Sequence, residues 1–229
     1  MKKLLLLSIC IGVLLSPLGC NSKKDDDAQI TDCTAVAESL RNPQTIEEAV
    51  NLINALPKPV QLDCFLNALQ APLKVFAVNS TSSAQPAQGA SSPRIFILKD
   101  KLSLSVVPAG AGKTLLEFGE VLSGQSFKGE IRFPVENTMT VNDITQYLSG
   151  GASTSSCAGC HLNEAKQIYK TPNQLFISNI FRPDETKRVG QTFMKIQAET
   201  CDSAVNKFRC DILKAIYING QAVDSAFTY

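Results

Sequence analysis

The sequence predicts an α+β fold, with helices toward both ends of the folded part and strands between them. Apolar residues recur at helical spacing near 46–56 and near 204–218, whereas the region between them alternates short β-type runs with turn sequences. About 210 residues follow an N-terminal leader, which is enough for one sizeable domain or two small ones with a buried core. We expect three folded segments, at 31–70, 71–140 and 141–229.

The first segment, residues 31–70, is predicted to be a small helical unit. Thr45 to Glu48 has the S/T-x-x-E pattern of a capping box, which marks the start of a helix. Pro57 ends the helical spacing, and a second helix is expected over 62–69. The apolar positions of the first helix are Ile46, Val50, Ile53 and Leu56.

Residues 71–140 form the predicted strand region, because short runs rich in apolar or β-branched residues are separated by turn sequences. A long stretch rich in Ser, Ala, Gln and Pro covers 79–93, and 108–112 links two strands. We expect an antiparallel β-sandwich or partial barrel of about five or six strands. The predicted runs are 75–78, 94–98, 102–106, 115–118 and 130–133.

One stretch of this region, residues 109–114, ends like a phosphate-binding P-loop, with the sequence Ala-Gly-Ala-Gly-Lys-Thr. The motif requires a glycine at position 107, where this chain has Val107. We therefore predict a turn here and expect no ATP partner.

The third segment, residues 141–229, is predicted to be a helical domain that follows a flexible Ser- and Gly-rich linker at 149–156. Helices are expected at 163–169, 184–200 and 204–218, and Asn219-Gly220 ends the last of them.

The N-terminus has the features of a secretory signal peptide over residues 1–19. Met1-Lys2-Lys3 supplies a basic start, and the apolar run from Leu4 to Leu15 is too short for a permanent membrane span. The following residues up to 30 are mostly polar and charged, which predicts a tether at 20–30.

The end of the leader, residues 16–20, resembles the lipobox of bacterial lipoproteins. Gly19 and Cys20 match that pattern, whereas Pro17 stands where leucine is usual. The resemblance implies lipidation of Cys20 and attachment to a bacterial membrane, at the outer membrane or the periplasmic face. Cleavage by an ordinary signal peptidase after Gly19 is the alternative, and it would give a periplasmic protein without the anchor.

The charge balance excludes one class of partner. The formal net charge is +1 and no predicted helix carries a basic stripe, so we do not expect nucleic acid binding.

Six cysteines remain once Cys10 leaves with the signal and Cys20 carries lipid. An exported chain meets an oxidising compartment, where such an even set usually forms disulfides. Their positions suggest three local pairs, although six cysteines allow fifteen connectivities. The expected disulfides are Cys33–Cys64 and Cys201–Cys210, and the third close pair is Cys157 with Cys160.

The third pair lies in Cys157-Ala158-Gly159-Cys160-His161, the C-x-x-C-H pattern of c-type haem attachment. Two thiols at this spacing add to the two vinyl groups of one haem, and the adjoining histidine becomes the proximal iron ligand. His161 is the only histidine of the chain, so two-histidine ligation within one molecule is excluded. We expect one haem c. The alternatives are a disulfide or redox-active dithiol at Cys157 and Cys160, and a zinc site is less favoured because it lacks a fourth ligand.

The motif and its surroundings resemble class I cytochromes c over about twenty residues. Pro172 to Leu175 lies where that family has a proline-containing loop, which implies that the Pro172 carbonyl orients His161. The family's axial methionine lies further downstream than Met194. We expect Met194, or less favourably Met139, as sixth ligand, and otherwise a lysine, a water or an open site. The expected haem-lining residues are Leu162, Leu175, Phe176, Ile180 and Phe181.

The leading hypothesis from the sequence is an envelope-anchored cytochrome-like protein for one-electron transfer or for redox or small-ligand sensing, with an unknown redox partner protein. The rival is a disulfide-stapled envelope binding or structural lipoprotein without haem. An enzyme is not favoured, because Asp143, Glu164 and Asp184 are interpreted as caps or solvated charges rather than as acid–base groups.

Overall fold

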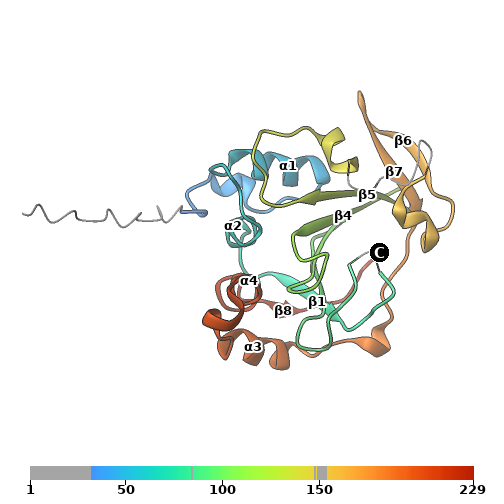
Figure 1. The fold of residues 1–229 in the computed structure, drawn as a ribbon. Coiled ribbons are helices and arrows are strands. Elements are labelled where there is room, and N and C mark those ends of the chain that lie inside the picture. The colour runs from blue at the N-terminus through green and yellow to red at the C-terminus, as the bar shows by residue number, and fades with distance from the viewer. Residues whose placement is uncertain (1–31, 84, 147, 149–153) are drawn as a thin grey trace, which may run out of the picture. The chain divides into compact units, whose positions relative to one another are not determined.

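The computed structural model describes residues 32–83, 85–146, 148 and 154–229 (Figure 1). The described residues from Asp32 onward form one compact unit. The predicted signal peptide, the lipobox with Cys20 and the tether lie outside the described residues, as does most of the predicted linker at 149–156.

A single open sheet of mixed type organises the described part of the chain and contains eight strands there, in the order β6-β7-β5-β4-β3-β2-β1-β8. Every neighbouring pair is antiparallel except β1 and β8, which are parallel. The predicted α+β class, with strands flanked by helices, is confirmed. The strands are β1 (Lys74–Val78), β2 (Arg94–Leu98), β3 (Leu102–Val106), β4 (Leu115–Leu122), β5 (Gln125–Arg132), β6 (Ala165–Lys170), β7 (Asn173–Asn179) and β8 (Val223–Asp224).

The main helices pack on one side of this sheet. Figure 1 shows α1 (Ile46–Ala55), α2 (Leu62–Ala68) and α4 (Ser203–Lys214) along that side. The remaining α-helix among the described residues is α3 (Gln191–Glu199), and a π-helical turn, η5 (Ala215–Asn219), continues α4. Short 3-10 turns lie at η1 (Glu38–Leu40), η2 (Val141–Thr145), η3 (Ser156–Gly159) and η4 (Glu185–Lys187).

The start of α1 follows from its capping sequence. The Thr45 hydroxyl accepts a hydrogen bond from the backbone N–H of Glu48 at 3.2 Å, as the capping pattern predicts. The Glu48 carboxylate in turn accepts from the backbone N–H of Gln44 at 2.6 Å. The first bond satisfies an N–H group that the helix itself leaves without a partner, and the second fixes the chain just before the cap.

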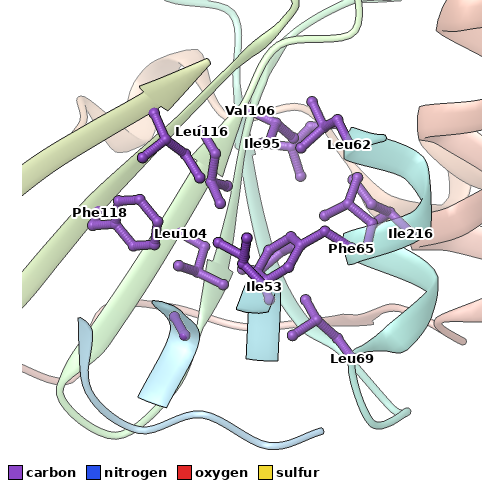
Figure 2. Close-up of a cluster of buried hydrophobic side chains, with 14 of the residues drawn as sticks. Ile53, Leu62, Phe65, Leu69, Ile95, Leu104, Val106, Leu116, Phe118 and Ile216 are labelled. Carbon is purple, nitrogen blue, oxygen red and sulfur yellow. The ribbon is translucent and has the colours of Figure 1, made fainter. Parts of the chain in front are cut away.

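The main hydrophobic core lies between the helices and one face of the sheet. Side chains of a strand alternate between its two faces, so every second residue of the central strands enters this core. Each fully buried Leu, Ile or Phe side chain contributes roughly 1.5–3 kcal/mol from burial. Figure 2 shows the cluster, with Ile53, Leu62, Phe65, Leu69 and Ile216 from the helices against Ile95, Leu104, Val106, Leu116 and Phe118 from the strands.

The third segment differs most from its prediction. Residues 163–169 were expected to be helical, but Ala165–Lys170 is strand β6, which forms a hairpin with β7. Hydrogen bonding of β7 to β5 adds the hairpin to the sheet, and this pairing outweighs the weak helical pattern. The helix expected at 184–200 is limited to Gln191–Glu199, while the predicted helix at 204–218 is confirmed by α4 and η5.

Both predicted disulfides are present. Cys33–Cys64 joins the segment before α1 to α2, and Cys201–Cys210 joins the end of α3 to α4. Among the described residues, no helix combines the length and apolar character needed to cross a bilayer.

Candidate functional site

The face of the sheet opposite the main core is mixed, and it forms the floor of a cavity of about 230 Å³. Strands β3 to β5 place mainly polar side chains on this face, whereas β1 and β2 place a second apolar cluster there, formed by Phe76, Val78, Phe96 and Leu98. The central strands place alternate residues on it, in register between the apolar residues that face the helices. The floor residues include Arg94, Ser103, Ser105, Glu117, Ser126 and Lys128. The remaining walls come from the loop at 80–83, from Cys157 and His161, from residues 180–184 and from Phe227 and Tyr229.

An ion pair occupies the middle of this floor. The Arg94 guanidinium contacts a carboxylate oxygen of Glu117 and donates to the Ser105 hydroxyl at 2.9 Å. Glu130 lies directly across from Glu117 on β5 and is also buried. Burial, reinforced by the charge of Glu117, raises the pKa of Glu130 to about 7.

Lys128 is the second cation of the floor, and only 5% of its surface is exposed. Its Nζ atom has no hydrogen-bond partner, and Glu164 lies 4.0 Å away. Burial lowers the pKa of Lys128 to about 8, while the neighbouring Cys157 and Glu164 oppose that shift.

The C-x-x-C-H motif forms the 3-10 turn η3 at the edge of the cavity. The Ser155 hydroxyl accepts from the backbone N–H of Cys157 at 3.1 Å, and the Cys157 carbonyl accepts from the backbone N–H of His161 at 2.9 Å. Glu164 closes the loop, since its carboxylate accepts from both the backbone N–H and the hydroxyl of Ser155, the latter at 2.7 Å. The motif is therefore held in a defined turn against the sheet.

The two thiols of the motif are not joined to each other. Cys157 is half-buried and lines the cavity, whereas Cys160 is exposed. Burial raises the pKa of the Cys157 thiol, partly offset by its hydrogen bond with Ser155 and by the charge of Lys128. Both thiols are thus available for covalent chemistry.

His161 is half-buried and also lines the cavity. Burial, followed by the positive charge of Lys128, lowers the pKa of His161 to about 4, so the imidazole is neutral at pH 7. A neutral imidazole is the form that binds a metal. The Nδ1 atom is buried without a hydrogen-bond partner, and the ring meets the Phe181 ring edge-on at 5.4 Å.

Of the residues expected to line a haem, Ile180 and Phe181 line the cavity. Leu162 adjoins the motif with 70% of its surface exposed. Phe176 pairs with Lys128 across β7 and β5 but does not line the cavity, and Leu175 points into the main core instead.

Pro172 lies far from His161 and the C-x-x-C-H motif. It lies at the turn between β6 and β7, whereas His161 lies just before the start of β6. The length of β6, roughly 17 Å at about 3.3 Å per residue, separates the two ends of the hairpin. The structure therefore offers no contact through which the Pro172 carbonyl orients His161.

Neither methionine candidate lines the cavity. Met194 is fully buried in the main core, on the opposite side of the sheet, and Met139 packs at the edge of that core. The amphipathic pattern of α3 directs Met194 into the core, which is the usual role of a helical methionine.

Several site residues were not identified from the sequence. Glu164 was interpreted as a cap or solvated charge, but its buried carboxylate holds the motif loop, whereas Asp143 and Asp184 do form the expected caps. In β5, polar residues at every second position, Ser126, Lys128 and Glu130, alternate with residues that face the core, and that alternation is a signal that could have revealed Lys128. Arg94 and Glu117 lie in otherwise largely apolar strands and have no such signal. The predicted turn at 109–114 is present, with Gly110 at a φ of 87°.

Among the described residues, no group of three or more His, Cys, Asp or Glu side chains is arranged to hold a metal ion. No protein-family model matches the chain, and no curated protein or solved structure matches it either.

Proposed function

We propose that this protein carries one covalently attached haem c at Cys157 and Cys160, with His161 as the proximal iron ligand. Its role would be one-electron transfer or redox-linked sensing at the bacterial cell envelope. The observation that carries the proposal is the five-residue motif itself, which has two free thiols and a neutral histidine. Cys157 and His161 line one cavity, and Cys160 is exposed beside it.

The residues around the motif suit an attached macrocycle. The other four cysteines of the described part are bonded in pairs, whereas Cys157 and Cys160 are left free. Leu162 and Phe181 expose 70% and 61% of their surfaces beside the motif. Exposed apolar side chains next to a binding motif are the surface that an apolar ligand covers.

Each residue of the motif has a separate task. The thiols of Cys157 and Cys160 would each add across one vinyl double bond, with sulfur bonding to one carbon and hydrogen to the other. His161 would offer a neutral nitrogen to the iron, and the Ser155–Glu164 hydrogen bonds hold the turn that carries all three side chains. The bound haem would supply a one-electron Fe(III)/Fe(II) couple whose potential depends on its ligands and on burial.

The cellular setting follows from the leader. Lipidation of Cys20 would hold the protein at a bacterial membrane, in the exported environment where thioether attachment and disulfides are both formed. A redox partner protein would then meet the haem at the exposed side of the motif. Since no methionine lines the cavity, we assign neither Met194 nor Met139 to the sixth position.

The test is production of the full precursor in cells that contain a cytochrome c maturation system. The wild type should show the α-band of a pyridine haemochrome and a mass increase of one haem. The double variant Cys157→Ser/Cys160→Ser should lose both signals. The matched control is Cys201→Ser/Cys210→Ser, which also replaces two cysteines, here those of a disulfide, but should keep its haem. A wild type without the haem mass would contradict the proposal.

The second candidate is an envelope binding protein without haem, stapled by its two disulfides. The polar cavity favours it, because that site is built independently of the motif thiols. In this case the exported wild type would carry no haem, and alkylation followed by mass analysis would show whether Cys157 and Cys160 are thiols or a disulfide.

A further inference from the structure

The cavity gathers buried polar atoms that lack partners. Among the described residues, five buried side-chain nitrogen or oxygen atoms have no hydrogen-bond partner. Four of them belong to residues that line this one cavity: Glu117, Lys128, His161 and Tyr229. Buried polar groups are satisfied in the large majority of cases, so their concentration at one cavity indicates a site completed by a ligand.

The charges at the cavity indicate the sign of that ligand. The carboxylate of Glu117 is matched by Arg94, and that of Glu164 accepts two hydrogen bonds from Ser155. Lys128 has no such match, since its nearest carboxylate oxygen is 4.0 Å away and its side chain is 7% exposed. A buried ammonium group without a bonded partner is costly, and an anion within hydrogen-bond distance removes that cost.

The other lining groups narrow the class of anion. The Tyr229 hydroxyl is a further buried donor without a hydrogen-bond partner. Arg182 and Lys187 add two positive charges to the cavity wall and Asp184 adds one negative charge, so the lining remains positive on balance. A carboxylate has two oxygens that accept hydrogen bonds from two separate donors. The volume of about 230 Å³ limits the occupant to a small molecule or to part of a larger one.

We propose that this cavity is a carboxylate-binding site in which Lys128 Nζ is the principal donor and Tyr229 Oη the second. A carboxylate at this position has two possible sources: a propionate of the haem attached at the neighbouring motif, or a free small carboxylic acid. The first source rests on the proposed function, whereas the second does not.

The first arm of the test uses the full chain made without haem maturation, with succinate as the probe. Isothermal titration should show binding that Lys128→Gln weakens at least tenfold and Tyr229→Phe weakens less. The matched control is Lys99→Gln, since Lys99 is another lysine whose pKa burial lowers to about 8, but it lies outside the cavity and contacts Asn42. Circular dichroism and thermal unfolding establish that each variant is folded.

The second arm uses the haem-loaded protein with ¹³C-labelled propionate carboxyl groups. If a propionate occupies the site, Lys128→Gln should raise the titration midpoint of one propionate by at least one pH unit, whereas Lys99→Gln should leave that midpoint unchanged. The haem-loaded wild type should then no longer bind succinate. If the haem-loaded wild type still binds succinate through Lys128, the free carboxylate is the ligand.

The outcomes separate the two proposals. Absence of haem overturns the proposed function and leaves the succinate titration to decide the carboxylate site. Haem attachment with no effect of Lys128→Gln on either succinate binding or the propionate midpoint overturns the carboxylate site alone. A water-filled polar cavity would then be the explanation for the unpartnered atoms.

Discussion

The two faces of the sheet bury side chains for different purposes. The face toward α1, α2 and α4 is filled by Leu, Ile, Val and Phe. The opposite face carries the second apolar cluster on β1 and β2, but beside it lie charged residues: Glu130 and Lys128 are buried, and Arg94 and Glu117 are half-buried. Apolar burial stabilises the fold, while burial of charge costs free energy unless each charge is paired. The comparison teaches that the face toward the helices stabilises the fold, whereas the buried charges of the opposite face lower its stability.

One buried charged residue, Glu120, lies on the face toward the helices. Glu120 is 1% exposed there, but its carboxylate accepts from the backbone N–H of Ile46 at 2.7 Å and from the Tyr169 hydroxyl at 2.5 Å. Lys128 on the other face is nearly as buried and has no hydrogen bond. A buried charge that serves structure is satisfied within the chain, whereas Lys128 is not.

The largest effect is expected from a truncation on the face toward the helices. Phe65→Ala removes a fully buried ring that packs against Phe133 at 6.0 Å between centroids. The free energy of unfolding in urea should fall by about 3–5 kcal/mol, because a cavity is left in the core. Ser103→Ala, on the opposite face, should change it by less than about 1 kcal/mol. Equal losses for the two variants would contradict the division of roles.

The buried Glu130 should make the free energy of unfolding depend on pH. The pKa of Glu130 is raised from 4.5 to about 7, so the folded state retains the proton after the unfolded chain has lost it. Its contribution to stability is therefore complete below pH 4.5 and is lost as the pH rises through 7. Relative to Glu130→Gln, the wild type should lose up to about 3 kcal/mol between these limits, at about 1.4 kcal/mol per pKa unit.

Denaturant unfolding at closely spaced pH values measures this difference. Glu130→Gln is the reference for the wild type, because the amide keeps the size of the side chain and does not ionise. A wild-type minus variant difference that stays constant from pH 4 to pH 8 would show that Glu130 titrates normally in the folded protein.

A smaller loss of stability is expected when one of the hydrogen bonds to the buried Glu120 carboxylate is removed. Tyr169→Phe removes one of the two hydrogen bonds that Glu120 accepts and should cost about 1.5–3 kcal/mol, the usual range for bonds to a charged group. Tyr217→Phe is the matched control, since the buried Tyr217 hydroxyl has no hydrogen-bond partner. A greater loss for Tyr217→Phe than for Tyr169→Phe would refute this account of Glu120.

The smallest change in global stability is expected from the hydrogen bonds that Ser155 makes with Glu164 and Cys157, called here the Ser155 clamp. Ser155→Ala removes the hydroxyl that joins Glu164 to the N–H of Cys157 and should cost about 1 kcal/mol or less in global stability. Its local effect should be larger. Hydrogen exchange of residues 155–161 and alkylation of Cys157 should both become faster, with Ser126→Ala as a control from the cavity floor. Unchanged rates would mean that the turn does not depend on the clamp.

The parts of the fold with strong local signals were predicted correctly. The limits of β2 and β3, the capped start of α1 and the final helix follow from short-range patterns. The disulfides follow from grouping neighbouring cysteines along the chain, which are 9 residues apart in Cys201–Cys210 and 31 apart in Cys33–Cys64. The β6–β7 hairpin was missed because its strand form depends on pairing with β5, which no local pattern reveals. The motif residues were identified as a group, but Lys128 comes close to them only because β5 and β7 pair in the sheet. Glu164 lies three residues after His161, and its bond to Ser155 depends on the loop conformation, which no local pattern reveals.

The strand order has a consequence for the partly folded chain. Both outermost strands, β6 and β8, come from the last third of the sequence, while residues 74–132 supply the five strands between the β7 and β8 positions. A chain that ended before β6 would leave β5 and β1 as bare sheet edges, which invite pairing with other molecules. The finished edge at β6 instead carries Lys166 and Lys170, charges that discourage such pairing. Completion of the C-terminal segment therefore covers the edges of the sheet formed by residues 74–132 and also places the motif against that sheet.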